Sequence, residues 1–566
     1  MRKTIKVTVQ EAEEGKPLDE PVDFETAISL TGFGKFNYML LLVAFPAAMV
    51  SVFDTTTMAY ILPVAQCDLG LTNLDKGGLN AITYAGMITS AFMWGGLSDT
   101  LGRQRLLRIS LIVDGLLALA SAFAVQLWAM FLLRYLVGFT VCGPYAMLMS
   151  FLAEFHSTKY RSRCIMFTGI GVATANYLIP SFALALLTQT WELEVGSGLV
   201  LKPWNVFIMA CSLPALLAGG LMSFFPETPK FLMSKGRNGE ALTVFRKIYA
   251  LNTGRSPDSY PVQRLVDELE LRKASVASTM SVHQSAIQGL KNAWRQMRPL
   301  FVMPQLPKAV LSFSIQILCL FSMNTIRLWL PQIFATMEEF LYFQQLTDGV
   351  GMASLTVNDS DNSVYLCDML TYQSVPQVDN TSIVSKLVDL LDGDDDNDIV
   401  NATLAIAGNT PCLPTVANSR LYINSIIVGA VSALGYSCAG QFVNWLGYRT
   451  LMMICFFSSG AFGIGVQWST NTDLTLAMLS LYLALVGICS TCMMGVVVTI
   501  FPTSLRTTAV SLTMMFGRIA ALSGNVIFPV LLDISCQLPF FIVSGVNIAN
   551  AAFTRLLPVT KGKTLA

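Results

Sequence analysis

Long apolar runs alternate with short polar stretches along most of this 566-residue chain. A helix needs about 20 apolar residues to cross the hydrocarbon core of a bilayer. Twelve runs have about this length, approximately residues 36–60, 77–97, 106–127, 129–151, 164–187, 204–225, 308–334, 421–445, 450–468, 474–498, 508–532 and 538–557. Six precede a polar central gap and six follow it. The pattern predicts an all-α membrane protein with twelve transmembrane helices in two six-helix halves.

Composition supports this prediction. The chain is 53% hydrophobic and 13% charged, and its mean hydropathy is +0.57, values that are too apolar for a water-soluble protein. Its 36 basic and 36 acidic residues leave no net charge, which argues against a nucleic-acid partner and leaves the lipid bilayer as the surroundings. Residues 1–35 lack the apolar core of a cleavable signal peptide, so we expect the first apolar run to direct insertion.

Lysine and arginine are concentrated in alternate loops. The arm before the first run, the loops after the second and fourth runs and the central gap are basic, whereas the opposite loops hold only Lys76, Lys202, Lys386 and Arg420. Because positive loops stay in the cytoplasm, both termini are expected there. The expected segments are a cytosolic arm (1–35), the first six-helix half (36–225), a cytosolic linker (226–307), helix 7 (308–335), a lumenal or extracellular loop domain (336–420), helices 8–12 (421–557) and a cytosolic C-terminus (558–566).

The two long loops have different characters. In the linker, residues 239–252 and 262–275 keep apolar positions at helical spacing, which predicts two amphipathic helices under the bundle. The later loop is acidic and carries three glycosylation sequons, at Asn358, Asn380 and Asn401. In an oxidising compartment Cys367 and Cys412 are expected to form a disulfide, with Cys67 as a rival partner. The aspartate run 392–398 lacks the closing glutamate of an EF-hand, and no cysteine spacing fits zinc, so neither a metal nor a cofactor is expected.

A set of motifs occurs in both halves, with an offset of 345 residues between the first two pairs. In the first half it reads Gly95-x-x-x-Asp99-x-x-Gly102-Arg103-x-Arg105, then Glu154 with Arg161, then Pro226-Glu227-Thr228. In the second half it reads Gly440-x-x-x-Asn444-x-x-Gly447-x-Arg449, then Thr499 with Arg506, then Pro558-Val559-Thr560. The chain is therefore a duplicated membrane unit.

These motifs resemble those of the major facilitator superfamily. Glu154 with Arg161, the run Pro226-Glu227-Thr228-Pro229-Lys230 and the run Pro558-x-Thr560-Lys561-Gly562 are similar to the branch of sugar porters and organic-ion transporters. A large glycosylated loop between helices 7 and 8 resembles the synaptic vesicle glycoprotein 2 family and its invertebrate relatives. The resemblance implies the major facilitator fold in a monomeric protein. The chain departs from that family at Ser51, Ser490, Met494, Thr499 and Val559, where acidic or aromatic residues are usual.

The motif residues at the cytosolic helix ends are interpreted as a gate. Asp99 is able to accept bonds from a neighbouring helix end only when the halves close on that side, and so to latch the outward-open state. The glycines permit a tight turn. The predicted gating residues are Gly95, Asp99, Gly102, Arg103, Arg105, Glu154, Arg161 and Arg506.

Substrate chemistry is expected at the midplane, where a charged side chain costs about 2.5–3.5 kcal/mol and so should have a partner or a role. Asp54 is the candidate for proton or cation coupling, although pairing with an arginine for structure alone explains it equally well. Asp114 and Arg134 are expected to form a structural pair. The other candidates for a ligand pocket are Arg327, Asn176, Tyr177, Asn324, Trp329, Arg518 and Asn525.

Two functions fit these patterns. The first is a secondary transporter that moves a small polar or charged organic solute by alternating access, with or without proton coupling as a symporter or antiporter. The second is a non-transporting vesicle glycoprotein that binds protein partners through its lumenal loop and cytosolic segments. No nucleotide loop, nucleophile triad or metal cluster occurs, so the chain is not expected to be an enzyme. The resemblance implies a plasma-membrane or secretory or synaptic vesicle location.

Overall fold

The computed structural model describes residues 20–124, 126–195, 199–267, 297–349, 364–371 and 419–557. Within these ranges twelve helices have 18 residues or more, as the apolar pattern predicted. The first six are α3 (Lys35–Leu69), α4 (Asn73–Leu101), α5 (Arg103–Ser121), α6 (Leu127–Phe155), α7 (Thr158–Leu186) and α8 (Pro203–Met222). The second six are α13 (Leu306–Gly349), α17 (Ser419–Leu446), α18 (Tyr448–Gly465), α19 (Thr472–Ile500), α20 (Thr503–Ile534) and α21 (Gln537–Thr554).

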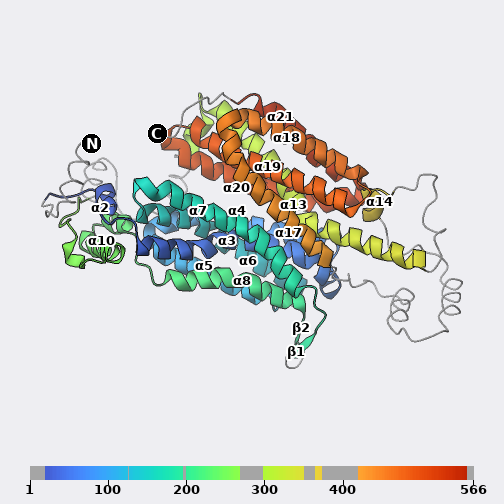
Figure 1. The fold of residues 1–566 in the computed structure, drawn as a ribbon, viewed down its shortest axis with the longest axis horizontal. Helices are drawn as coiled ribbons and strands as arrows, with labels where there is room; N and C mark the ends of the chain where they lie inside the picture. The colour runs from blue at the N-terminus through green and yellow to red at the C-terminus, as the bar shows by residue number, and fades with distance from the viewer. Residues whose placement is uncertain are drawn as a thin grey trace.

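The helices run along one direction and form two bundles side by side (Figure 1). Eight of them are long and apolar enough to cross a membrane by themselves, namely α3, α6, α7, α8, α13, α18, α19 and α20. The more polar ones include α5, which carries three arginines and the buried Asp114. Such helices are stable in a bilayer because their polar side chains face other helices.

Small residues let the helices approach closely. A Cβ atom at Gly138 of α6 would overlap the Thr83 carbonyl oxygen of α4, and one at Gly77 would lie 2.6 Å from the Asn525 carbonyl oxygen of α20. Small residues at such crossings favour packing between membrane helices. The two halves meet where α3 contacts α13, α4 contacts α20 and α7 contacts α17.

The duplicated motif has the same backbone role in both halves. Gly102 has a φ of 96° before α5, and Gly447 has a φ of 76° before α18. This region of φ suits glycine and allows the tight connection from one helix to the next.

Short helices cover one end of the bundle, which we call the α10 end. They are α2 (Phe24–Leu30), α9 (Pro229–Ser234), α10 (Asn238–Thr253) and the 3-10 turn η1 (Pro257–Ser259), while η2 (Arg298–Phe301) precedes α13. Figure 1 shows α2 and α10 beyond the ends of the long helices. The apolar face of α10 is buried, so the predicted amphipathic helix at 239–252 is confirmed.

The second amphipathic helix predicted in the linker is wrong over its described part. Residues 262–267 are not helical, and Leu265 forms a parallel bridge with Val22. The backbone N–H of Val22 donates to Arg264, and that of Val266 donates to Val22, each over 3.0 Å. These bonds to the N-terminal segment replace those that a helix would make; residues 268–275 lie outside the described ranges.

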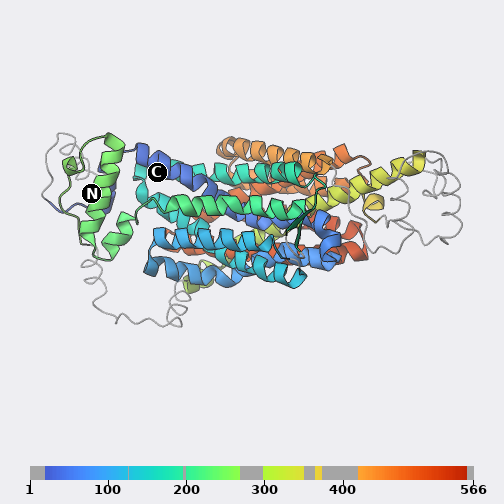
Figure 2. The same ribbon diagram turned by 90° about the horizontal axis from the view of Figure 1, so that it is seen from below.

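The opposite end of the bundle is called the α14 end. It carries the hairpin of β1 (Leu193–Val195) and β2 (Leu199–Leu201), the short helix α14 (Leu366–Thr371) and the turn η3 (Val466–Trp468). Figures 1 and 2 show α13 extending beyond the other helices here. The sequence predicted an end near residue 334, but α13 continues to Gly349 because the residues after the apolar run still favour a helix.

The expected disulfide between Cys367 and Cys412 is wrong. Cys367 is bonded to Cys536, and their Cα atoms are 5.6 Å apart. The reason lies in the docking of α14, since the backbone N–H of Leu366 donates to the Ser469 carbonyl over 3.1 Å and so holds α14 against the second half. Cys67 is also in a disulfide. Cys412 and the sequons at Asn358, Asn380 and Asn401 lie outside the described residues.

Candidate functional site

A cavity lies between the two halves, at the contacts of α3 and α7 with α13, α17 and α19. Its volume is about 70 Å³, several times the roughly 10–15 Å³ that one water molecule needs. Apolar side chains such as Ile179, Met323 and Leu483 form much of its wall. Its polar lining residues are Thr56, Tyr60, Asn176, Arg327, Ser425, Ser432 and Tyr436. The cavity therefore combines an apolar wall with a few polar groups, as ligand sites do.

Among the described residues that line this cavity, Arg327 of α13 is the one with a charged side chain. Its Nε atom is buried and has no hydrogen-bond partner among the described residues. The phenol groups of Tyr60 on α3 and Tyr436 on α17 lie within electrostatic range of its guanidinium group, and Tyr60 is also hydrogen-bonded to Ser425. A cationic group thus lies at the junction of the two halves, and no acidic residue that the structure describes forms an ion pair with it.

The structure places only Arg327 and Asn176 of the predicted pocket residues on the cavity wall. Tyr177, the neighbour of Asn176, is 47% exposed. Tyr84 donates to Asn324 over 3.3 Å. The remaining three side chains contact other groups: Trp329 packs against Phe528, Asn525 donates to the Ala521 carbonyl, and Arg518 donates to the Cys142 sulfur.

Three buried charged residues form a second cluster, inside the first half. Asp54 of α3, Asp114 of α5 and Arg134 of α6 are at most 4% exposed. The carboxyl groups of Asp54 and Asp114 are hydrogen-bonding neighbours, and Arg134 lies within electrostatic range of both. Thr140 donates to Asp114 over 2.6 Å. The structure therefore adds Asp54 to the Asp114 and Arg134 pair that the sequence predicted.

The charges of this cluster do not balance when all three groups are ionised. Two carboxylates and one guanidinium leave one negative charge, and a single proton on either carboxyl group makes the cluster neutral. One oxygen of Asp54 and one of Asp114 are buried without a hydrogen-bond partner in the described structure. Because an uncompensated buried charge is costly, the cluster is chemically suited to hold one exchangeable proton.

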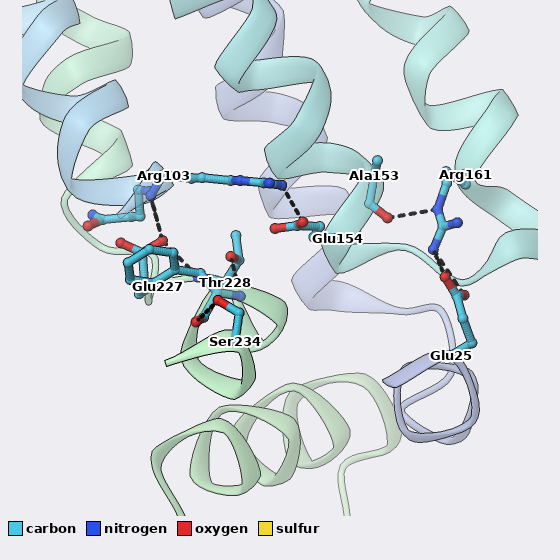
Figure 3. Close-up of polar contacts among 10 residues, drawn as sticks. Glu25, Arg103, Ala153, Glu154, Arg161, Glu227, Thr228 and Ser234 are labelled. Carbon is cyan, nitrogen blue, oxygen red and sulfur yellow. Dashed lines mark hydrogen bonds and ion pairs between the residues drawn. The ribbon is translucent and has the colours of Figure 1, made fainter. Parts of the chain in front are cut away.

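At the α10 end, Glu227 caps α5 (Figure 3). Its carboxylate accepts the backbone N–H groups of Arg103 and Gln104 over 3.0 Å each, and that of Arg105 over 3.4 Å. These are N–H groups that the first turn of a helix leaves without a partner, and a carboxylate there also interacts well with the helix dipole. A Cβ at Gly102 would overlap this carboxylate, which explains the motif glycine. Glu227 belongs to the motif Pro226-Glu227-Thr228, but its role as a helix cap was not predicted from the sequence.

The predicted gating arginines have separate partners. Arg103 forms an ion pair with Glu154 of α6, as expected for one charge network. Arg161 instead binds Glu25 of α2 over 2.8 Å and the Ala153 carbonyl over 2.8 Å (Figure 3). The sequence did not single out Glu25, since a lone acid in a polar arm gives no signal. The surroundings of Gly95 and the side chains of Asp99 and Arg506 lie outside the described part of the structure, so the Asp99 latch remains a prediction.

The described residues contain no group of three histidine, cysteine, aspartate or glutamate side chains placed to hold a metal ion. His156, which follows α6, is buried, and its Nδ1 atom lies 2.7 Å from the Leu152 carbonyl. Burial lowers the pKa of His156 below its ordinary value, with a further small effect of Arg161. The other histidine, at position 283, lies outside the described residues.

Known relatives match this architecture. A segment covering 40% of this chain is 33% identical to synaptic vesicle glycoprotein 2A of Rattus norvegicus, and covers 31% of that protein. Synaptic vesicle glycoprotein 2B of Homo sapiens is 30% identical over 40% of this chain and 34% of its own length. The matches thus span about a third of these curated relatives.

Solved structures have the same fold. The partially occluded inward-open xylose transporter XylE from E. coli matches with a TM-score of 0.60 and 16% identity, over 94% of this chain and 99% of that chain. A bacterial homologue of the human lysosomal transporter Spinster, inward-facing and unoccupied, gives a TM-score of 0.55 with 11% identity over 93% and 96% of the two chains. The family model described as sugar (and other) transporter matches residues 26–338 and 414–566. This multi-pass membrane protein therefore belongs to the sugar (and other) transporter family of the major facilitator superfamily.

Proposed function

We propose that the protein is a secondary active transporter that moves a small polar or charged organic solute by alternating access and couples the movement to protons. The observation that carries the proposal is the cavity between the halves, because rocking of two repeats around a shared central site is how such transporters work. Its walls come from α3 and α7 of the first half and from α13, α17 and α19 of the second.

Asp54 is proposed to carry the coupled proton. It lies on α3 two residues before Thr56, which lines the cavity, and its cluster with Asp114 and Arg134 becomes neutral with one proton. Gain or loss of that proton changes the charge inside the first half next to the solute site. The protonation state of Asp54 is therefore expected to change the affinity of the cavity for the solute.

The halves are joined along the part of α4 that is nearest the α14 end. Asn73 donates to Asp533 over 3.1 Å, and Asn80 donates to the Leu328 carbonyl over 3.5 Å. A separation of the halves at the α14 end would break these bonds. We propose that they form the gate on this side, which the orientation predicted by the positive-inside rule places in the lumen or outside the cell.

The test is solute uptake into liposomes that contain the purified protein, with an imposed pH gradient and a panel of radiolabelled sugars, amines and organic acids. We expect accumulation of a solute that stops when a protonophore removes the gradient. Asp54→Asn should abolish accumulation while leaving exchange of internal for external solute. Asp258→Asn is the matched control, because it removes an exposed carboxylate outside the bundle. Equal accumulation by Asp54→Asn would contradict the coupling role.

The second candidate function is a vesicle glycoprotein that binds partners through residues 336–420 and the cytosolic segments. The similarity to synaptic vesicle glycoproteins 2A and 2B favours it. If this second function holds, the protein binds partners, and liposomes that contain it take up no solute. Loss of partner binding on deletion of residues 359–409, together with an absence of uptake, would support it over transport.

A further inference from the structure

We infer that the cavity binds the carboxylate group of a small organic acid through Arg327. The physiological meaning of this site rests on the proposed transport function, but binding can be measured independently. Of the cavity-lining residues that the structure describes, Arg327 alone is charged, and none is an aspartate or glutamate. The other polar side chains that line the cavity are neutral hydroxyl and amide groups.

Arg327 is half-buried and has no acidic partner among the described residues. Its Nε atom is buried and makes no hydrogen bond to any residue that the structure describes, and no described acidic side chain forms an ion pair with it. A cation in a membrane helix is unfavourable unless it is paired or hydrated. Arg134, by contrast, lies within electrostatic range of the carboxyl groups of Asp54 and Asp114, although two of its nitrogen atoms also make no hydrogen bond to a described residue. The missing counter-charge is therefore expected to come from the bound solute.

The surroundings favour a carboxylate over other groups. A guanidinium presents parallel N–H groups that match the two oxygens of a carboxylate. Tyr60 and Tyr436 lie within electrostatic range of Arg327 from α3 and α17, so each half places a phenol group near the guanidinium. The apolar wall suits the carbon skeleton of the acid. A neutral sugar would leave Arg327 without a counter-charge in the cavity.

Charge balance follows from this assignment. One carboxylate cancels the charge of Arg327, and one proton cancels the excess charge of the Asp54 cluster. Together they leave no net charge in the cavity and cluster. A cycle with one proton for each monoanion is therefore electroneutral.

The experiment measures binding to the purified full-length protein by thermal shift, with matched pairs of solutes that differ in charge. The probes are lactate with lactamide, benzoate with benzamide, and inorganic phosphate as a non-carboxylate anion. Arg327→Gln removes the positive charge. Arg327→Lys keeps the charge but loses the planar guanidinium group with its parallel N–H donors. Lys308→Gln is the matched control, because it removes a positive charge from the same helix about 28 Å away at 1.5 Å per residue.

We expect at least one carboxylate to bind wild type with a Kd about tenfold or more below that of its amide, a preference that Lys308→Gln keeps and Arg327→Gln loses. Arg327→Lys should bind with intermediate affinity. Ligand-free Arg327→Gln should be at least as stable as wild type, because the unpaired cation is gone. This second readout does not depend on the choice of probes.

Three results would overturn the inference: equal shifts for acids and amides, binding of carboxylates by Arg327→Gln, or no shift with any carboxylate at 10 mM, which is about a hundredfold above a Kd of 0.1 mM. Tighter binding of phosphate than of either acid would reassign the site to inorganic anions. Arg327-dependent binding without uptake would leave the site in place and contradict only the transport proposal.

Discussion

The cap of α5 by Glu227 gives a prediction whose size follows from the structure. Glu227→Ala leaves the backbone N–H groups of Arg103, Gln104 and Arg105 without their acceptor. Loss of a capping side chain typically costs about 0.5–2 kcal/mol, and a favourable charge at a helix N-terminus adds about 0.3–1 kcal/mol. Because Glu227 is partly exposed and water replaces some of these bonds, we expect a total loss in the lower part of the summed range, about 1–2 kcal/mol.

Glu227→Gln separates the two contributions. The amide oxygen still accepts the N–H groups of Arg103 and Gln104, so the charge contribution and the longer bond to Arg105 should be lost, about 1 kcal/mol. The assay is unfolding of the purified protein in detergent, followed by tryptophan fluorescence. Glu240→Gln serves as the control, since Glu240 is exposed and pairs with Arg237 three residues before it, an interaction worth about 0.5 kcal/mol or less. A Glu227→Ala variant as stable as Glu240→Gln would refute the capping role.

Three further predictions concern stability in the same assay. The lowered pKa of His156 means that the unfolded chain binds more protons as the pH falls through about 6.5; stability should therefore drop from pH 7.5 to 5.5 in wild type, and by less in His156→Gln. Gly138→Ala should destabilise strongly, because its Cβ overlaps the backbone of α4, whereas Gly220→Ala, which meets open space, should not, and equal melting temperatures would contradict this packing. Exchanging the charges of Arg161 and Glu25 should restore part of the stability that either single reversal removes, and additive losses in the double-mutant cycle would argue against the pair.

Sequence patterns predicted the helices well because the bilayer imposes a simple rule. Each span needs a continuous apolar run, and each of the twelve runs corresponds to a long helix in the described structure. The positions of Asp54, Asp114 and Arg134 were also evident, since charges inside apolar runs are conspicuous. Their grouping was only partly predictable. Which side of each helix faces its neighbours depends on packing across helices that are far apart in sequence.

The cavity could not be predicted in full. Tyr60 and Tyr436 line it, but a tyrosine in a membrane helix gives no distinguishing signal, and Trp329 or Asn525 were as good candidates from sequence alone. The Cys367 to Cys536 disulfide joins residues 169 positions apart, and sequence cannot choose among several cysteines in one compartment. These features depend on long-range contacts rather than on local pattern.

The most direct test of transport is solute-driven proton movement across the membrane of liposomes that contain the wild-type protein and a pH-sensitive dye. Addition of organic acids, sugars or amines outside should change the internal pH for the solutes that bind, and protein-free liposomes correct for passive entry of the undissociated acids. We expect a protein-dependent pH change that Asp54→Asn abolishes. Binding without any protein-dependent pH change or uptake would contradict proton-coupled transport and support a partner-binding glycoprotein.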